Sequence, residues 1–128
     1  MKKNGFSLIE LIVVITIIAV ITVIGTVNYG ATNRKARDSR RTADIEKIRI
    51  ALEMARQIGS TYPVNIDVLV TNGFINGTLP RDPKTGDIYY YDQLTNYTYE
   101  VGTSMEDLGS TNSVSTGCGS CNYGVRNP

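Results

Sequence analysis

The feature that most constrains this chain is an uncharged, apolar run near its N-terminus. No charged residue occurs from Leu11 to Asn33. The run is about 23 residues long, and a helix of that length, rising roughly 1.5 Å per residue, spans the ~30 Å hydrocarbon core of a bilayer. Isoleucine and valine dominate it and favour strands in water. In lipid the backbone must satisfy its own hydrogen bonds, so we predict a single membrane-spanning helix.

One carboxylate interrupts the start of this run. Glu10 lies one helical turn inside the apolar segment that begins at Phe6. A charged side chain at the bilayer centre costs about 2.5–3.5 kcal/mol on insertion scales, and less near an end of the helix. Either Glu10 has a partner and a function, or its carboxylate extends to the headgroups and has no further role. The residues alone leave both interpretations open.

A cleaved secretory signal is the alternative to a retained helix. The apolar run is longer than the usual ~7–15 residues of such a signal, and charged residues rather than a small-residue cleavage site follow it. A small residue, Gly5, instead precedes the run. Cleavage after Gly5 would keep the apolar segment and create a new amino group on Phe6, largely protonated at neutral pH. That ammonium would lie one turn from Glu10.

The first ten residues, MKKNGFSLIE, followed by the apolar run, resemble the class III signal of type IV pilins and pseudopilins. The resemblance closely covers residues 1–30. It implies that a prepilin peptidase cleaves after Gly5 and N-methylates Phe6. It also implies that Glu10 pairs with the N-terminus of a neighbouring subunit during filament assembly. Such a pair offsets two desolvation penalties and selects one register, because a slipped subunit leaves both charges unpaired.

The helix is expected to continue well beyond the apolar run. One apolar face recurs at three- and four-residue steps, and Gly59 with Ser60 supplies a stop signal. The residues of this face are Ile45, Ile48, Leu52, Ala55 and Ile58. We therefore predict a leader over residues 1–5 and a stem helix over 6–58, hydrophobic over 6–30 and amphipathic over 31–58.

Two glycines, Gly25 and Gly30, are weak points in this predicted stem. Related pilins often carry a helix breaker here, so the helix could extend locally around Gly25 in the filament. The alternative is that the glycines allow close packing between helices. Both interpretations stay open.

The remaining residues, 59–128, should form a small head. Asn65–Gly73 is expected to be a short helix with Asn65 as N-cap and Gly73 as C′, and Pro80–Gly86 a loop. The predicted fold class is α+β and type IV pilin-like: a long N-terminal helix packed against a small antiparallel sheet, followed by a tail that contains two cysteines.

Alternating residues predict a hairpin in this head. Asp87–Tyr91 and Tyr97–Val101 are expected to pair as strands across Asp92–Asn96. Tyr97, Tyr99 and Val101 would share the face that packs on the stem, with Thr98 and Glu100 opposite.

The two cysteines, Cys118 and Cys121, form a C-x-x-C motif. Such a motif can be redox-active, half of a zinc site or a small disulfide. The sequence has no histidine and no further cysteine, so a complete zinc site within one chain is not favoured. The extracellular head implied by the resemblance favours a disulfide.

Calcium is the one metal that the resemblance raises, because some secretion pseudopilins bind it in the head. The candidate ligands are Asp82, Asp87, Glu106 and Asp107, but their spacing differs from that of an EF-hand loop. We favour solvated surface acids, and therefore predict no metal and no cofactor.

The composition favours a structural protein over an enzyme. The absence of histidine rules out a histidine general base, and no glycine-rich phosphate loop occurs. Residues 34–58 carry eight basic and four acidic side chains, whereas residues 59–128 carry three basic and seven acidic ones. Because phosphate-backbone binding depends on lysine and arginine, the acidic head does not favour a nucleic-acid partner.

The resemblance therefore implies a structural subunit of a type IV pilus, a surface filament for adhesion, motility or DNA uptake. The alternative is a pseudopilin of a type II secretion or competence machine. The implied partners are other copies of the chain in a helical filament, the prepilin peptidase, and an assembly platform with its ATPase.

The count of basic residues and the family resemblance predict opposite orientations in the membrane. Five basic residues follow the span and two precede it, and this count alone would place the head in the cytoplasm. The resemblance implies the reverse: a single-pass protein of the cytoplasmic (inner) membrane with its head outside, and later an extracellular pilus.

Overall fold

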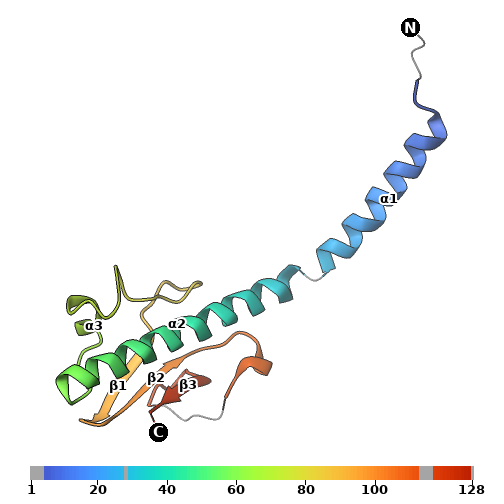
Figure 1. The fold of residues 1–128 in the computed structure, drawn as a ribbon. Helices are drawn as coiled ribbons and strands as arrows, with labels where there is room; N and C mark the ends of the chain where they lie inside the picture. The colour runs from blue at the N-terminus through green and yellow to red at the C-terminus, as the bar shows by residue number, and fades with distance from the viewer. Residues whose placement is uncertain (1–4, 28, 113–116, 128) are drawn as a thin grey trace. The chain divides into compact units, whose positions relative to one another are not determined.

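A computed structural model describes residues 5–27, 29–112 and 117–127 of the chain. These residues fall into two compact units, Met1–Asn33 and Arg34–Pro128. The first unit contains helix α1 (Leu8–Val27) and the start of helix α2 (Tyr29–Gly59). The second contains the rest of α2, a short helix and a three-stranded sheet (Figure 1).

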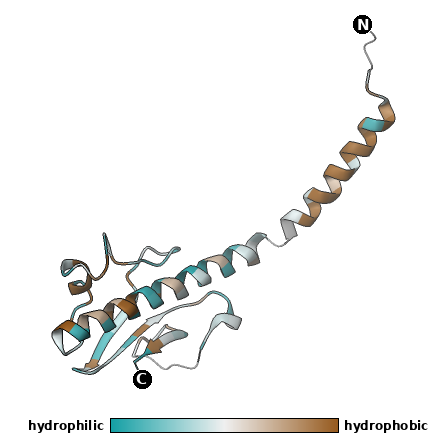
Figure 2. Ribbon diagram, viewed as in Figure 1, coloured by the Kyte–Doolittle hydropathy of each residue, from teal (hydrophilic) through white to brown (hydrophobic). Residues whose placement is uncertain are grey.

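Helix α1 is apolar along nearly its whole length (Figure 2). Its isoleucine and valine side chains are exposed on every side of the helix. Within the described residues, Leu8–Gly25 is the one segment long and apolar enough to cross a membrane. The predicted hydrophobic helix is therefore present, beginning at Leu8 rather than Phe6.

The predicted stem helix appears as two described helices, because residue 28 lies outside the described residues. Gly25 lies within α1 and Gly30 within α2. Local extension around Gly25 concerns the assembled filament and stays a prediction.

Helix α2 ends at Gly59, where the stop signal was expected. Ser60 follows in the left-handed region with φ of 65°, and its N–H donates to the carbonyl of Arg56 at 2.7 Å. This bond satisfies one of the last helix carbonyls. Four of the five residues predicted for the apolar face are buried, but Ile58 is 78% exposed and its assignment to the core was wrong. Ile58 stands in the last turn of α2, four residues after Met54, which is exposed as well.

Helix α2 packs against the sheet, in which β1 (Tyr90–Thr95), β2 (Thr98–Thr103) and β3 (Tyr123–Arg126) are antiparallel in the order β1-β2-β3. Tyr91 pairs with Val101, and Val101 pairs with Val125. The antiparallel hairpin was predicted, whereas β3 was not.

The hairpin is longer than predicted and its turn is shorter. Strand β1 runs to Thr95, so the connection is Asn96 and Tyr97 rather than Asp92–Asn96. The second half of β1 is held by polar contacts: the Gln93 side-chain amide donates to the carbonyl of Tyr62 at 2.8 Å. Tyr97 therefore sits exposed in the turn, and its predicted place on the core face was wrong.

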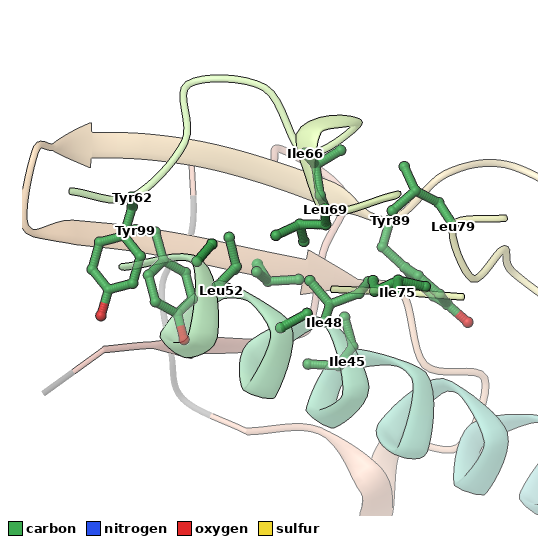
Figure 3. Packing of buried hydrophobic residues seen from close by; sticks show 13 residues of the cluster. Ile45, Ile48, Leu52, Tyr62, Ile66, Leu69, Ile75, Leu79, Tyr89 and Tyr99 are labelled. Atoms are coloured by element: carbon green, nitrogen blue, oxygen red, sulfur yellow. The ribbon is translucent and has the colours of Figure 1, made fainter. Parts of the chain in front are cut away.

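The core lies between α2, the segment that follows it, and the hairpin. Figure 3 shows Ile45, Ile48 and Leu52 of α2 beneath side chains of the 62–79 segment and of the hairpin. The rings of Tyr62 and Tyr99 meet edge to face with centroids 4.6 Å apart. Tyr99 and Val101 are buried as predicted.

The predicted short helix is present but reduced to α3 (Val68–Thr71). Asn65 accepts a hydrogen bond from the backbone N–H of Asp67 in a turn before the helix, so the N-cap assignment to Asn65 was wrong and Asp67 takes that position. Gly73 follows the C-cap with φ of 76°, the conformation expected of a C′ glycine.

Candidate functional site

The residues implicated in processing lie immediately before α1. Gly5, Phe6 and Ser7 precede the helix and are exposed. A non-helical peptide bond near a chain end is the kind that proteases reach most readily. The predicted cleavage bond between Gly5 and Phe6 is therefore accessible in the isolated chain.

Glu10 occupies the first turn of α1 and is held by Ser7. The backbone N–H of Ser7 donates to Glu10 Oε2 at 2.9 Å, and the backbone N–H of Glu10 donates to Ser7 Oγ at 3.4 Å. This reciprocal arrangement is a capping box, in which residues N-cap and N3 satisfy two free amides at the helix start. The carboxylate also lies near the positive end of the helix dipole.

Ser7 is thus a residue of this site that our sequence analysis missed. The signal was present, since Ser-x-x-Glu before an apolar run is the sequence pattern of a capping box. The arrangement keeps the Glu10 carboxylate at the N-terminal end of α1, near the residue that processing would make the first.

A second polar cluster lies in the head, with Arg41 of α2 at its centre. The Arg41 side chain is 2% exposed. Its guanidinium contacts Asp38 at 2.6 Å, Asp82 at 2.6 Å and Glu106 at 3.0 Å. Arg37 binds Glu106 at 2.7 Å. The cluster connects the first turns of α2 within the head unit to two loops far away in the sequence, one containing Asp82 and the other Glu106.

These contacts overturn our interpretation of Asp82 and Glu106 as solvated surface acids. Both side chains are mostly buried against cationic groups: Arg41 on Asp82, and Arg37, Arg41 and Lys84 on Glu106. Asp87, by contrast, is exposed. Among the described residues, no group of three or more histidines, cysteines or acids could hold a metal ion.

The cluster shifts the titration of its acids. The bond from Arg41 lowers the pKa of Asp82 to about 2, against the opposing effect of burial. Bonds from Arg37, then from Lys84 and Arg41, hold the pKa of Glu106 far below its usual value. Burial alone would raise the pKa of Asp38, but the backbone N–H groups of Glu106 and Asp107 and the Arg41 side chain lower it overall.

We predict that the head loses stability in acid over the range from about pH 4 to pH 2. These acids have lower pKa values folded than unfolded, so their stabilisation is complete above about pH 4 and is lost as pH falls through the folded values. For Asp82, a shift from 3.8 to about 2 corresponds to about 2 kcal/mol. Denaturant titrations of the full chain in detergent at several pH values measure how the free energy of unfolding changes with pH. The Asp82→Asn variant should lose less unfolding free energy than the wild type as the pH falls from about 4 to 2. An equal loss in both proteins would contradict the assignment of this pH dependence to Asp82.

Glu100 lies opposite the core face, as predicted, yet it is buried. The C-terminal segment covers it: Arg126 donates to its carboxylate at 2.7 Å, and the Tyr90 hydroxyl and the Gly117 N–H donate as well. Burial raises the pKa of Glu100, and the bonds from Gly117, Arg126 and Tyr90 lower it overall. The alternation of residues along β2 could not predict that Glu100 is covered, because the covering residues lie far along the chain.

The same C-terminal segment contains a disulfide between Cys118 and Cys121, with Cα atoms 5.4 Å apart. Its loop is short, so it constrains the tail locally rather than the whole head. The Asn122 side chain holds the adjoining residues by accepting from the N–H of Met105 at 2.6 Å.

These features define a class: a pilin-like α+β protein, in which an apolar, capped N-terminal helix accompanies a small sheet-bearing head. Residues 1–26 match a family model described as the prokaryotic N-terminal methylation motif, the class III signal of type IV pilins and pseudopilins. No curated protein and no solved structure matches the chain. The match supports a type IV pilin-like or pseudopilin subunit, which is a structural class rather than an enzyme class. It implies processing by a prepilin peptidase and assembly into pilus-type filaments, and together with the apolar helix it is consistent with membrane anchoring before assembly.

Proposed function

We propose that this chain is a structural subunit of a type IV pilus, which leaves the membrane by bundling its α1 with the α1 helices of other copies. The observation that carries the proposal is the uncovered surface of α1, whose large apolar side chains are exposed on all sides. In water, such a surface requires a partner. The methylation motif at its start supports other helices of the same kind as that partner.

Glu10 supports a subunit added throughout the filament. Its carboxylate would pair with the Phe6 ammonium of a neighbour, after cleavage at Gly5 and methylation of Phe6. The Cys118–Cys121 disulfide fits a head outside the cytoplasm, because disulfides persist in oxidising compartments. The pilus platform and its ATPase would supply the work of extraction from the membrane.

The second candidate is a pseudopilin of a type II secretion or competence machine. The same α1 and the same processing site serve either filament, so the N-terminal motif favours neither. The cysteine-bearing C-terminal segment packed over Glu100 is our reason for preferring a surface pilin, as a covered and cross-linked tail suits an exposed fibre.

Two measurements test the proposal. Electron microscopy of host cells with and without the gene should show long surface fibres that disappear on deletion; unchanged fibres would contradict the pilus and favour the pseudopilin. Mass spectrometry of the mature protein should give a chain that begins at Phe6, is one methyl group heavier, and lacks the two thiol hydrogens of Cys118 and Cys121. A native protein that retains residues 1–5 would contradict both filament roles.

A further inference from the structure

Two asparagine–glycine pairs lie close together just after α3, and the structure places them in different settings. Asn72–Gly73 directly follows the helix, and Asn76–Gly77 comes four residues later. Both asparagines are exposed to solvent. A third pair, Asn4–Gly5, belongs to the predicted leader. Exposure therefore does not distinguish the two pairs of the head, whereas their backbone hydrogen bonds do.

An asparagine that precedes a glycine can react with its own backbone in water. The glycine nitrogen attacks the side-chain amide carbon of the asparagine, and a carbon–nitrogen bond forms. The amide nitrogen leaves as ammonia, carrying the proton that the backbone nitrogen gives up. Water then opens the five-membered ring at either carbonyl and leaves aspartate or isoaspartate. Glycine favours this attack because it has no Cβ to crowd the approach and adopts conformations that other residues avoid.

The backbone of the first pair is tied to α3. The N–H of Gly73 donates to the carbonyl of Val70 at 3.0 Å, and the N–H of Asn72 donates to the carbonyl of Val68 at 2.9 Å. These bonds hold Asn72 as the C-cap of the helix and Gly73 in the left-handed conformation of C′. The nitrogen of Gly73 must therefore give up its hydrogen bond before it can attack the neighbouring side chain.

The second pair has no such restraint. Within the described residues, no hydrogen bond engages the N–H of Gly77 or the side chain of Asn76. No atom of another segment lies within 4 Å of the place that a Cβ of Gly77 would take, so nothing crowds this turn. Ile75 and Leu79, on either side of the pair, are buried in the core (Figure 3). The pair thus belongs to a short exposed loop that is anchored at both ends and unbonded at its reactive nitrogen.

We propose that Asn76 is a site of spontaneous deamidation, and that the cap of α3 protects Asn72 from the same reaction. The product adds a negative charge to residues 59–128, which are already net acidic. Isoaspartate also lengthens the backbone by one carbon between the buried side chains of Ile75 and Leu79. Because the reaction consumes only water, the converted fraction increases with the time that a subunit has spent in solvent. The inference concerns the head alone and does not depend on the proposed function.

The test follows the full chain in detergent during incubation in warm, mildly basic buffer. Peptide mass spectrometry locates the gain of one mass unit at each asparagine. We expect Asn76 to convert roughly tenfold faster than Asn72, because one hydrogen bond of ordinary net strength changes a rate about two- to tenfold and two such bonds hold the first pair. Asn76→Gln should remove most of the conversion, since glutamine closes a larger ring more slowly. The matched control, Asn72→Gln, should leave the conversion of Asn76 unchanged.

The wild-type chain in denaturant separates the effect of structure from that of sequence. Unfolding frees both pairs, so Asn72 and Asn76 should then convert at about equal rates. Equal rates in the folded chain, or faster conversion of Asn72, would overturn the inference. An Asn76 that stays unmodified in the folded chain while the denatured chain converts would overturn it as well. So would a larger adduct on Asn76 in protein purified from the host, because it would show that an enzyme modifies this site.

Discussion

Arg41→Ala is expected to destabilise the head by about 3–5 kcal/mol, the cost typical of removing one partner from a buried ion pair. The change leaves the carboxylates of Asp38, Asp82 and Glu106 without the guanidinium that bonds all three. A domain of this size has about 5–15 kcal/mol of stability in total, so much of it would disappear. The melting temperature of the full chain in detergent should fall by roughly 15 °C or more.

The control for this prediction is Arg49→Ala. Arg49 also pairs with an acid on α2, Glu46 at 3.3 Å, but the two side chains are 42% and 50% exposed. Exposed pairs of this kind contribute about 0–1 kcal/mol. Arg41→Lys should be intermediate, because an ammonium keeps the charge but cannot bond several carboxylates with a planar fork. Equal losses for Arg41→Ala and Arg49→Ala would show that burial of the cluster contributes nothing.

Glu10→Ala is expected to abolish filament assembly while the chain still inserts into the membrane. Insertion depends on the apolar surface of α1, which the substitution only increases. Assembly, in our proposal, depends on a carboxylate that pairs with the Phe6 ammonium of a neighbour. Immunoblots of membrane and sheared fractions measure the two steps separately.

Glu10→Gln separates the proposed charge pair from the capping box. Glutamine at N3 can still accept a bond from the Ser7 N–H, as glutamate does, but it carries no charge. We expect it to fail in assembly as alanine does. Ser7→Ala removes the reciprocal side-chain bond at a cost of about 1 kcal/mol and leaves the charge, so it should assemble. Filaments from Glu10→Gln at wild-type yield would mean that capping, not charge, is what assembly requires.

The parts of this protein that could be predicted from sequence depend on local periodicity. The apolar run predicted α1, and the three- and four-residue spacing of Ile45, Ile48 and Leu52 predicted the buried face of α2. Gly73 was correctly placed after a short helix, because its left-handed conformation is a local requirement. Ile58 continued the same spacing but is exposed, since periodicity cannot tell which residues of a face become covered.

The polar contacts of the head could not be predicted in this way. Arg41 and Asp82 are 41 residues apart, and Arg37 and Glu106 are 69 apart. Nothing local distinguishes them from exposed charges such as Arg49. Likewise, the alternation that placed Glu100 away from the core carried no sign of the strand β3 and the segment that cover it.

The sequence by itself determined that the chain has the methylation motif, an apolar helix, and a helix face that must be buried, because each depends on residues within a few turns of one another. The tertiary structure decided which charges become buried, which strand completes the sheet, and which face of α2 stays uncovered. Those outcomes depend on which distant segments come to lie side by side, and pairing across tens of residues leaves no local pattern.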